Sequence, residues 1–446
     1  MRKYFGTDGV RGVANVELTP ELAFKLGKSA GYVLTKNMKE QTMRPAFVVG
    51  RDTRISGSML ETALISGLTS SGVNVIQLGI VPTPAVAYIT KQLASGGVMI
   101  SASHNPYQDN GIKFFNQDGY KLLDEVELEI EHYLERLDDI PVCAGGDIGT
   151  ILSYKNAANF YVEFLKNSIS TSLEGLNIVL DCANGAATTV APTLFESLGA
   201  TVHVLSASPN GVNINVDCGS THPEELQRKV VELEADLGLA FDGDADRLIA
   251  VDETGAVVDG DQILYICAKA LRLKGKLTNQ TVVSTVMSNF GFQKALNELG
   301  VNSVQTSVGD RYVLEEMMKK GYTLGGEQSG HIIFLDLNTT GDGILSALQL
   351  ASIVKESSMS ITELLSGFKK YPQQLVNVKV KDKRAWESHP AIRNAIKEAE
   401  TVLADNGRVL VRASGTENLV RVMVEADSSE LVNKLVNSIA NEIQKS

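Results

Sequence analysis

Three aspartates alternate in the string Phe241-Asp-Gly-Asp-Ala-Asp-Arg247, directly after an apolar run. Hard cations such as Mg²⁺ prefer oxygen ligands, and Asp242, Asp244 and Asp246 offer three carboxylates from one loop. An EF-hand also begins with alternating acidic residues, and Glu253 fits its twelfth position. Its sixth position is Arg247 rather than glycine, however, and strands are predicted on both sides. The string therefore predicts a divalent-metal loop of another kind. The alternative is a solvated acidic turn that binds no metal.

A serine lies between small residues in Met99-Ile-Ser-Ala-Ser-His-Asn-Pro106, at the end of a second apolar run. Loops at strand ends are where α/β sheets bind ligands. Ser103 is followed by His104, and Lys113 comes soon after. A neighbouring serine and histidine are weak evidence of a nucleophile, because catalytic triads are assembled in space. No Gly-x-Ser-x-Gly turn surrounds this serine, so acyl transfer fits poorly.

Two more polar strings suit a sugar phosphate. In Leu324-Gly-Gly-Glu-Gln-Ser-Gly-His331, Glu327 and Ser329 offer an acceptor and a hydroxyl for sugar hydroxyls or an amine. In the second string, around Gly415, a forked cation, two hydroxyls and backbone N–H groups would suit a phosphate dianion; its residues are Arg412, Ser414, Gly415, Thr416 and Arg421. Ordinary polar turns between strands are the alternative interpretation of both.

The elements that must position these strings form a repeated pattern. A β-branched run, a helical stretch and a second apolar run occur at 46–76, at 177–205 and at 281–304. Each copy predicts a strand, a helix and a parallel strand, and such units build sheets covered on both faces. After the Tyr371-Pro372 break the order changes to a strand at 375–380, a helix at 384–404, two strands at 408–412 and 419–424, and a helix at 428–444. This order predicts a small α+β domain.

Composition limits the function classes. The chain has 446 residues, 43% hydrophobic and 21% charged, which predicts several globular domains. A formal net charge of −12 disfavours a nucleic-acid partner. No run approaches the length of a membrane helix, no signal segment is evident, and the four cysteines lack metal or redox spacing. We therefore expect a cytoplasmic protein with no membrane partner, in which any positive charge for phosphate is concentrated locally.

Together with the opening Phe5-Gly-Thr-Asp-Gly-Val-Arg-Gly12, the four strings resemble the α-D-phosphohexomutase superfamily, in family order along the whole chain. The resemblance implies an α/β fold, with three related mixed-sheet α/β domains and a C-terminal α+β domain around a central cleft. The expected domains are 1–150 with the phosphoserine loop, 151–257 with the metal loop, 258–371 with the sugar loop and 372–446 with the phosphate loop.

The resemblance also implies roles for individual residues. Ser103 would be carried as phosphoserine and, with the three aspartates, would hold one Mg²⁺. The transfer centre would be lined by Arg11, His104, Lys113 and Arg247. The sugar would be bound by Asp310, Arg311, Glu327 and Ser329, and its other phosphate by Arg412, Ser414, Gly415, Thr416 and Arg421. The general base stays open among His104, Lys113 and His331.

The substrate expectation rests on two places. Gln328 and the string Val308-Gly-Asp-Arg-Tyr-Val313 resemble the branch that interconverts glucosamine-6-phosphate and glucosamine-1-phosphate through a 1,6-bisphosphate, for cell-wall precursor synthesis. Glucose-1,6-bisphosphate or glucosamine-1,6-bisphosphate would act as primer, and the chain would form a homodimer. The alternatives are the branches that act on glucose or mannose phosphates and, more distantly, a metal-dependent sugar phosphatase.

Overall fold

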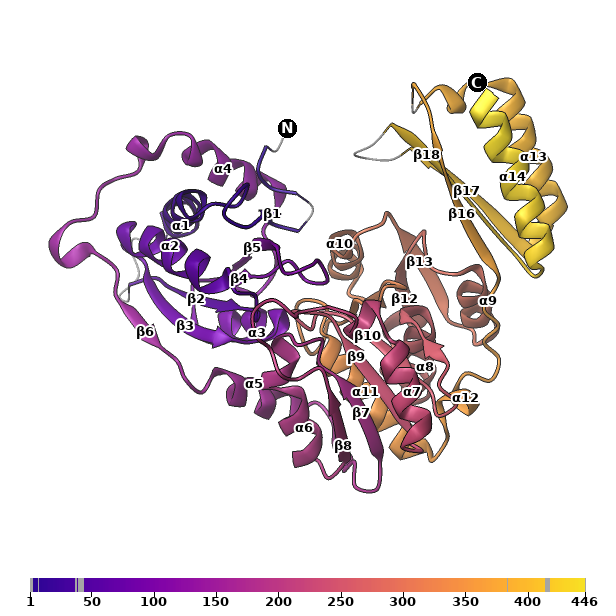
Figure 1. The fold of residues 1–446 in the computed structure, drawn as a ribbon, viewed down its shortest axis with the longest axis horizontal. Helices are drawn as coiled ribbons and strands as arrows, with labels where there is room; N and C mark the ends of the chain where they lie inside the picture. Colours follow the sequence, from indigo (N-terminus) through magenta and orange to yellow (C-terminus); the bar gives the residue numbers. More distant parts are fainter. Residues whose placement is uncertain are drawn as a thin grey trace. The chain divides into compact units, whose positions relative to one another are not determined.

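The computed structural model describes residues 3–6, 8–36, 38, 44–382, 384–413 and 418–445. The chain forms two compact units, residues 1–286 with 304–366 and residues 287–303 with 367–446. The first unit contains three sheets and the second contains one (Figure 1). The predicted central cleft stays a prediction.

The first sheet is mixed, in the order β1-β5-β4-β2-β3-β6. Its parallel strands β2, β3, β4 and β6 are joined at the β4 edge by antiparallel β5, which also pairs with β1. The strands are β1 (Val10–Val13), β2 (Ala46–Arg51), β3 (Asn74–Ile80), β4 (Gly96–Ile100), β5 (Asp109–Asn116) and β6 (Ile151–Ser153), and the helices are α1 (Pro20–Thr35), α2 (Gly57–Ser70), α3 (Thr83–Leu93) and α4 (Asp124–Leu134). Because β6 pairs with β3, this sheet extends just past residue 150.

Strand β2 shows why the first sheet is covered on both faces. Successive side chains of a strand point to opposite faces. Phe47 and Val49 are fully buried in a cluster with Leu64 of α2. On the opposite face, a Cβ at Gly50 would meet Val86 of α3 at 2.6 Å. Helices therefore pack on both sides, as the apolar run at 46–50 predicts.

The second and third sheets repeat the strand-helix-strand theme in the first unit. The second sheet, in the order β11-β10-β9-β7-β8, consists of β7 (Asn177–Asp181), β8 (Thr201–Leu205), β9 (Leu237–Phe241), β10 (Leu248–Val251) and β11 (Val257–Val258), with helices α5 (Ala157–Lys166), α6 (Ala191–Ser197) and α7 (Glu224–Glu232). The third, in the order β13-β12-β14-β15, consists of β12 (Thr281–Thr285), β13 (Asn302–Thr306), β14 (Leu324–Gly326) and β15 (Ile332–Phe334), with helices α8 (Gly260–Leu273), α10 (Asp310–Lys320), α11 (Gly343–Ser357) and α12 (Ile361–Leu364). The first pair of strands in the second sheet, β7 and β8, is parallel as predicted.

The second unit has the predicted order of elements. Its antiparallel sheet β16-β18-β17 has helices α13 and α14 on one face (Figure 1). The elements are β16 (Gln373–Lys379), α13 (Pro390–Leu403), β17 (Gly407–Ala413), β18 (Leu419–Ala426) and α14 (Ser429–Lys445), with α9 (Phe290–Glu298) from the inserted segment.

One boundary in the second unit was wrong. The helix expected from residue 384 begins at Pro390, because proline restricts the residue before it and suits the first helical position. His389 is accordingly extended, with φ −78° and ψ 118°.

The four cysteines are free thiols: Cys182, Cys218 and Cys267 are buried and Cys143 is half-buried. Among the described residues, no helix is long and apolar enough to cross a membrane.

Candidate active site

The serine loop, residues 101–109, connects β4 to β5 in the first unit. Ser103 is 2% exposed and has φ +53°, in the left-handed region that non-glycine residues rarely adopt. Its amide donates to Ser101 Oγ at 2.9 Å. Its own hydroxyl lies 3.2 Å from His104 Nδ1. The turn thus presents Oγ in one defined direction, at a site where the backbone is strained.

The three aspartates lie on the connection between β9 and β10, which are antiparallel neighbours. All three are buried, and their nearest carboxylate oxygens lie within 4.8 Å of one another. Ser103 Oγ donates to Asp242 Oδ2 at 2.5 Å. The structure therefore brings together the serine and the metal loop that the sequence separates by more than a hundred residues.

Buried carboxylates at this spacing repel one another. Burial, with the nearby charges of Asp246 and Asp244, raises the pKa of Asp242 well above its usual range. For Asp246, burial acts in the same direction, but His331 and Lys113 outweigh it and hold the pKa below its usual range. Asp244 Oδ1 and Asp246 Oδ1 are buried yet accept no hydrogen bond from the described part of the chain. Unsatisfied oxygens among three carboxylates fit a hard divalent cation.

Lys113 is the buried cation of this cluster. It projects from β5, is 1% exposed, and its Nζ lies 2.8 Å from Asp244 Oδ2 and 3.1 Å from Asp8 Oδ2. Burial alone would lower its pKa, but Asp244 and Asp8 together raise it. Thr83, at the start of α3, also donates to Asp244 Oδ2, at 2.7 Å. Lys113 therefore stays an ammonium ion and supplies fixed positive charge beside the triad.

A second set of charges surrounds His331. Its Nδ1 lies 3.7 Å from Asp246 Oδ2 and its Nε2 lies 3.5 Å from Asp310 Oδ2. Burial opposes protonation, yet these two aspartates raise the pKa of His331. Lys121 Nζ joins the set through contacts of 2.5 Å to both Asp8 and Asp310. Asp310, predicted to bind substrate, thus already balances two basic groups.

The other predicted transfer residues lie around the triad. Arg247 donates its amide to Asp242 Oδ1 at 3.1 Å, and its Nε lies 3.9 Å from Asp246 Oδ1. His104 is half-buried, and burial with the charges of Arg247 and Arg11 lowers its pKa to about 4. Arg11, on β1, pairs with Asp8. The structure therefore gathers Ser103 and the four residues predicted to line the transfer centre into one part of the first unit.

The sugar-loop residues are placed differently. Glu327 accepts the amide of Gly309 at 3.1 Å, which ties the predicted sugar loop to the loop before α10. Ser329 is exposed. Arg311 pairs with Asp124 and with Glu315 Oε1, the latter at 2.9 Å. The structure thus offers Glu327 and Ser329 to a ligand, whereas Arg311 already has two acidic partners.

The second unit contains a separate group of basic residues. Arg412 on β17 stands directly opposite Arg421 on β18. Burial, with the charge of Arg421, lowers the pKa of Arg412. Arg421 Nε is buried without a hydrogen-bond partner among the described residues. Like charges directly opposite on a sheet are destabilising, so this pair suits an anion. The other predicted members, Ser414, Gly415 and Thr416, lie outside the described residues.

Sequence reasoning missed several residues of the site. Asp8 lies inside the quoted N-terminal string, just before β1. Thr83 follows β3, a strand parallel to β2, so strand order could have indicated Thr83. The same signal applies to Asp52 and Arg54, which follow β2 in the string Gly-Arg-Asp-Thr-Arg. No sequence pattern indicates Lys121, because its contacts with Asp8 and Asp310 depend on segments associated with different sheets meeting in space.

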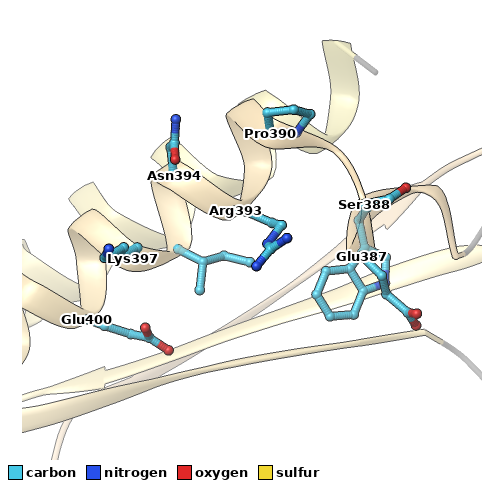
Figure 2. Close-up of a pocket in the computed structure, with 9 residues that line it drawn as sticks. Glu387, Ser388, Pro390, Arg393, Asn394, Lys397 and Glu400 are labelled. Carbon is cyan, nitrogen blue, oxygen red and sulfur yellow. The ribbon is translucent and has the colours of Figure 1, made fainter.

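A hollow of about 890 Å³ lies elsewhere, in the second unit. It is bounded by the first turns of α13 and by Trp386, with Arg393 and Lys397 along its wall (Figure 2). None of the predicted site residues lines it. Size alone is therefore a poor guide to chemistry here, and the carboxylate and lysine cluster of the first unit is the stronger candidate.

Descriptions of known domain families match most of the chain. The chain matches the four phosphoglucomutase/phosphomannomutase domain descriptions, which are domain I over residues 2–140, domain II over 159–255, domain III over 259–371 and the C-terminal domain over 375–442. The boundaries that we propose, after residues 150, 257 and 371, lie close to the gaps between these matches. Each match contains most of the strands of one of the four sheets.

Individual relatives span the whole chain. It is 58% identical to the phosphoglucosamine mutase of Anoxybacillus flavithermus and 56% identical to that of Bacillus subtilis, each comparison covering 100% of this chain and 99% of the relative. Among solved structures, a phosphoglucomutase/phosphomannomutase family protein of Burkholderia thailandensis superposes with a TM-score of 0.82 at 25% identity, covering 99% of this chain and 97% of that one. The chain therefore belongs to the phosphoglucomutase/phosphomannomutase family, with its four-domain architecture.

Proposed function

We propose that this chain interconverts glucosamine-6-phosphate and glucosamine-1-phosphate through a phosphoserine at Ser103. One observation carries the proposal: the Ser103 hydroxyl donates to Asp242, within a buried carboxylate triad that has unsatisfied oxygens and stands beside Lys113. Phosphoryl transfer needs positioning and charge neutralisation more than acid–base chemistry. This cluster supplies both.

The proposed reaction has two balanced transfers. First, the bond between phosphorus and Ser103 Oγ breaks while one to the free sugar hydroxyl forms; the hydroxyl loses its proton and Oγ gains one. The product is a sugar 1,6-bisphosphate. After this intermediate has turned round, the bond between its other phosphorus and the sugar oxygen breaks while a new bond to Ser103 Oγ forms. Oγ loses its proton, the freed sugar oxygen gains one, and the isomeric monophosphate leaves. Water is not consumed in either transfer, whereas a phosphatase would consume water and release inorganic phosphate.

The residues of the first unit have distinct proposed roles. Asp242, Asp244 and Asp246 would hold Mg²⁺ together with a Ser103 oxygen, and the ion when bound supplies positive charge next to the phosphoryl group. Lys113 and Arg247 add fixed positive charge. Asp244 and Asp8 raise the pKa of Lys113 and favour its ammonium form, and the general base stays open among His104, Lys113 and His331.

The second unit provides the proposed binding site for the phosphate that is not being transferred. Arg412 and Arg421 carry opposed positive charges that a phosphate would neutralise. The loop residues Ser414, Gly415 and Thr416, which lie outside the described part of the chain, belong to the same proposal from the sequence. Holding one phosphate while the other reacts is what a mutase needs, whereas simple hydrolysis does not require it.

The amino-sugar preference rests on the two relatives named phosphoglucosamine mutase and on the acidic side chain of Glu327, which would favour an ammonium group. A preference for glucose or mannose phosphates is the alternative within the family. We further propose a cytoplasmic homodimer, primed by glucose-1,6-bisphosphate or glucosamine-1,6-bisphosphate. Light scattering after size-exclusion chromatography would test the dimer.

The test is conversion of glucosamine-6-phosphate with Mg²⁺ and a trace of glucose-1,6-bisphosphate, beside glucose-6-phosphate and mannose-6-phosphate. Wild type should prefer the amino sugar, and Ser103→Ala should lose turnover with its melting temperature nearly unchanged. Preference for a neutral sugar would overturn the substrate assignment. Wild-type rates in Ser103→Ala would overturn the phosphoserine, and release of one phosphate per substrate would indicate a phosphatase.

A further inference from the structure

Arg54, which lies just beyond β2, is one of the most buried side chains of the first unit, at 1% exposure. A guanidinium carries five N–H donors. Here Nε donates to Asp52 Oδ2 at 2.8 Å. The other four donors all reach backbone carbonyls of the serine loop, those of Ser103 (2.9 Å), Asn105 (2.8 Å), Pro106 and Asp109 (3.1 Å). Every donor is therefore used, and four of the five hold the loop that carries the proposed nucleophile.

The same network closes on the Ser103 amide. Asp52 Oδ2 accepts the hydroxyl of Ser101 at 2.7 Å, and Ser101 Oγ accepts the amide of Ser103 at 2.9 Å. Both the N–H and the C=O of Ser103 are thus tied to the Arg54–Asp52 pair. These two peptide groups define the backbone rotation of Ser103, which has the unfavourable φ of +53°.

The metal-loop side of the structure holds the same carbonyls. Asn215 Nδ2 donates to the carbonyl of Ser103 at 2.9 Å and to that of Asn105 at 3.1 Å. Gly243, between two metal-loop aspartates, lies so close that a Cβ there would meet the Ser103 carbonyl at 2.6 Å. The serine loop is therefore clamped from its own sheet by Arg54 and from the neighbouring sheet's loops by Asn215.

A stability role alone explains this arrangement poorly. A buried ion pair costs so much desolvation that apolar replacements of similar volume are often as stable or more so. An arginine that donates four hydrogen bonds to one loop instead fixes the backbone conformation of that loop. We propose that Arg54 is a positioning residue, which holds residues 103–109 so that Ser103 Oγ meets the metal carboxylates in the same place in both phosphoryl transfers.

This inference rests on the proposed function, because it assigns a task to a loop whose serine reacts twice per turnover. Ser103 must donate to one sugar oxygen and accept from another without moving relative to the triad. A displacement of about 1 Å in such a site can lower a rate by about 10²-fold. Substrate binding would change less, since Arg54 is buried beneath the loop and has no donor left for a ligand.

The test is Arg54→Lys in the full chain with Mg²⁺. Lysine keeps the positive charge beside Asp52 but cannot serve four carbonyls from one ammonium group. We expect kcat for glucosamine-6-phosphate to fall about 100-fold with KM changed less than threefold, and backbone amides of residues 103–109 to exchange hydrogen at least tenfold faster. The matched control is Arg51→Lys, because Arg51 is the last residue of β2, close to Arg54 in the chain, but pairs with Glu61, at 3.0 Å. It should change neither readout.

A second variant covers the case in which Arg54→Lys does not fold. Asn215→Ala removes two bonds to the same carbonyls from the other side and leaves the Arg54–Asp52 pair intact. We expect a fall in kcat of about tenfold with KM kept. Normal exchange and kcat within twofold of wild type in both variants would overturn the inference. Absence of any mutase turnover in wild type would instead overturn the proposed function, and the exchange rates would still decide whether Arg54 holds the loop.

Discussion

Replacement of Lys113 by methionine tests the charge balance of the site directly. Methionine keeps most of the side-chain volume and removes the ammonium group that lies 2.8 Å from Asp244 Oδ2 and 3.1 Å from Asp8 Oδ2. Because Lys113 is 1% exposed, water cannot take over its role. Removing one partner of a buried ion pair costs about 3–5 kcal/mol. At about 2 °C per kcal/mol, expected for a large domain, the melting temperature should fall by roughly 6–10 °C without divalent ions.

Magnesium should reverse part of this loss. A ligand that binds only the folded chain at 100 times its dissociation constant stabilises it by about 2.7 kcal/mol. Since the variant leaves the triad more negative, Mg²⁺ should raise its melting temperature more than that of wild type. Turnover should still fall by about 10²–10³-fold, because fixed charge at the phosphoryl group is lost.

Calorimetry in EDTA and in Mg²⁺, with an activity assay on the same samples, would measure these effects. Lys166→Met is the control, because Lys166 pairs with Glu163 on the surface of helix α5. If Lys113→Met melted like wild type in EDTA, the triad would not depend on Lys113 for its charge balance. An equal Mg²⁺ response in both proteins would refute the assignment of the triad as the cation site.

Two further predictions concern charges outside the triad. Arg421→Met should raise KM for glucosamine-6-phosphate at least tenfold in steady-state assays. It should also stabilise the second unit by up to about 1 kcal/mol, because it removes a like charge opposite Arg412. A lower thermal stability with KM unchanged would contradict this prediction. Burial raises the pKa of Asp342, the N-cap of α11, from 3.8 to about 6, so its ionisation costs stability as pH rises from about 4 to above 6. Relative to Asp342→Asn, wild type should therefore lose up to about 3 kcal/mol over that range, and parallel melting-temperature curves would exclude such a shift.

Much of the fold follows from sequence pattern alone. The three apolar runs at 46–51, 177–181 and 281–285 are buried strands, and the polar residues that follow two of them mark strand ends where side chains gather. The C-terminal order of elements also follows from period and length. The error at the start of α13 came from giving helical periodicity more weight than Pro390, although proline and its restricted neighbour define the first turn.

The composition of the site was harder to predict, because its contacts are long-range. Ser103 and Asp242 are 139 positions apart, Lys113 and Asp244 are 131 apart, and Lys121 and Asp310 are 189 apart. Sequence pattern identifies strand ends, but which ends meet depends on how one sheet packs against the next. Resemblance to a family linked Ser103 to the aspartates; nothing comparable indicated Lys121 or the Arg54 network.

The two proposed phosphate sites also differ in how they provide positive charge for a phosphate within an acidic chain. In the first unit two lysines of the candidate site are embedded among carboxylates: Lys113 among Asp244 and Asp8, and Lys121 between Asp8 and Asp310. A phosphoryl group there would rely on a divalent ion to bring net positive charge. In the second unit Arg412 and Arg421 face each other on adjacent strands, so that a phosphate would itself relieve their repulsion. A site that must let a phosphoryl group leave is thus nearly balanced in charge before the ion binds, whereas the site that must hold one places two positive charges opposite each other in its described part.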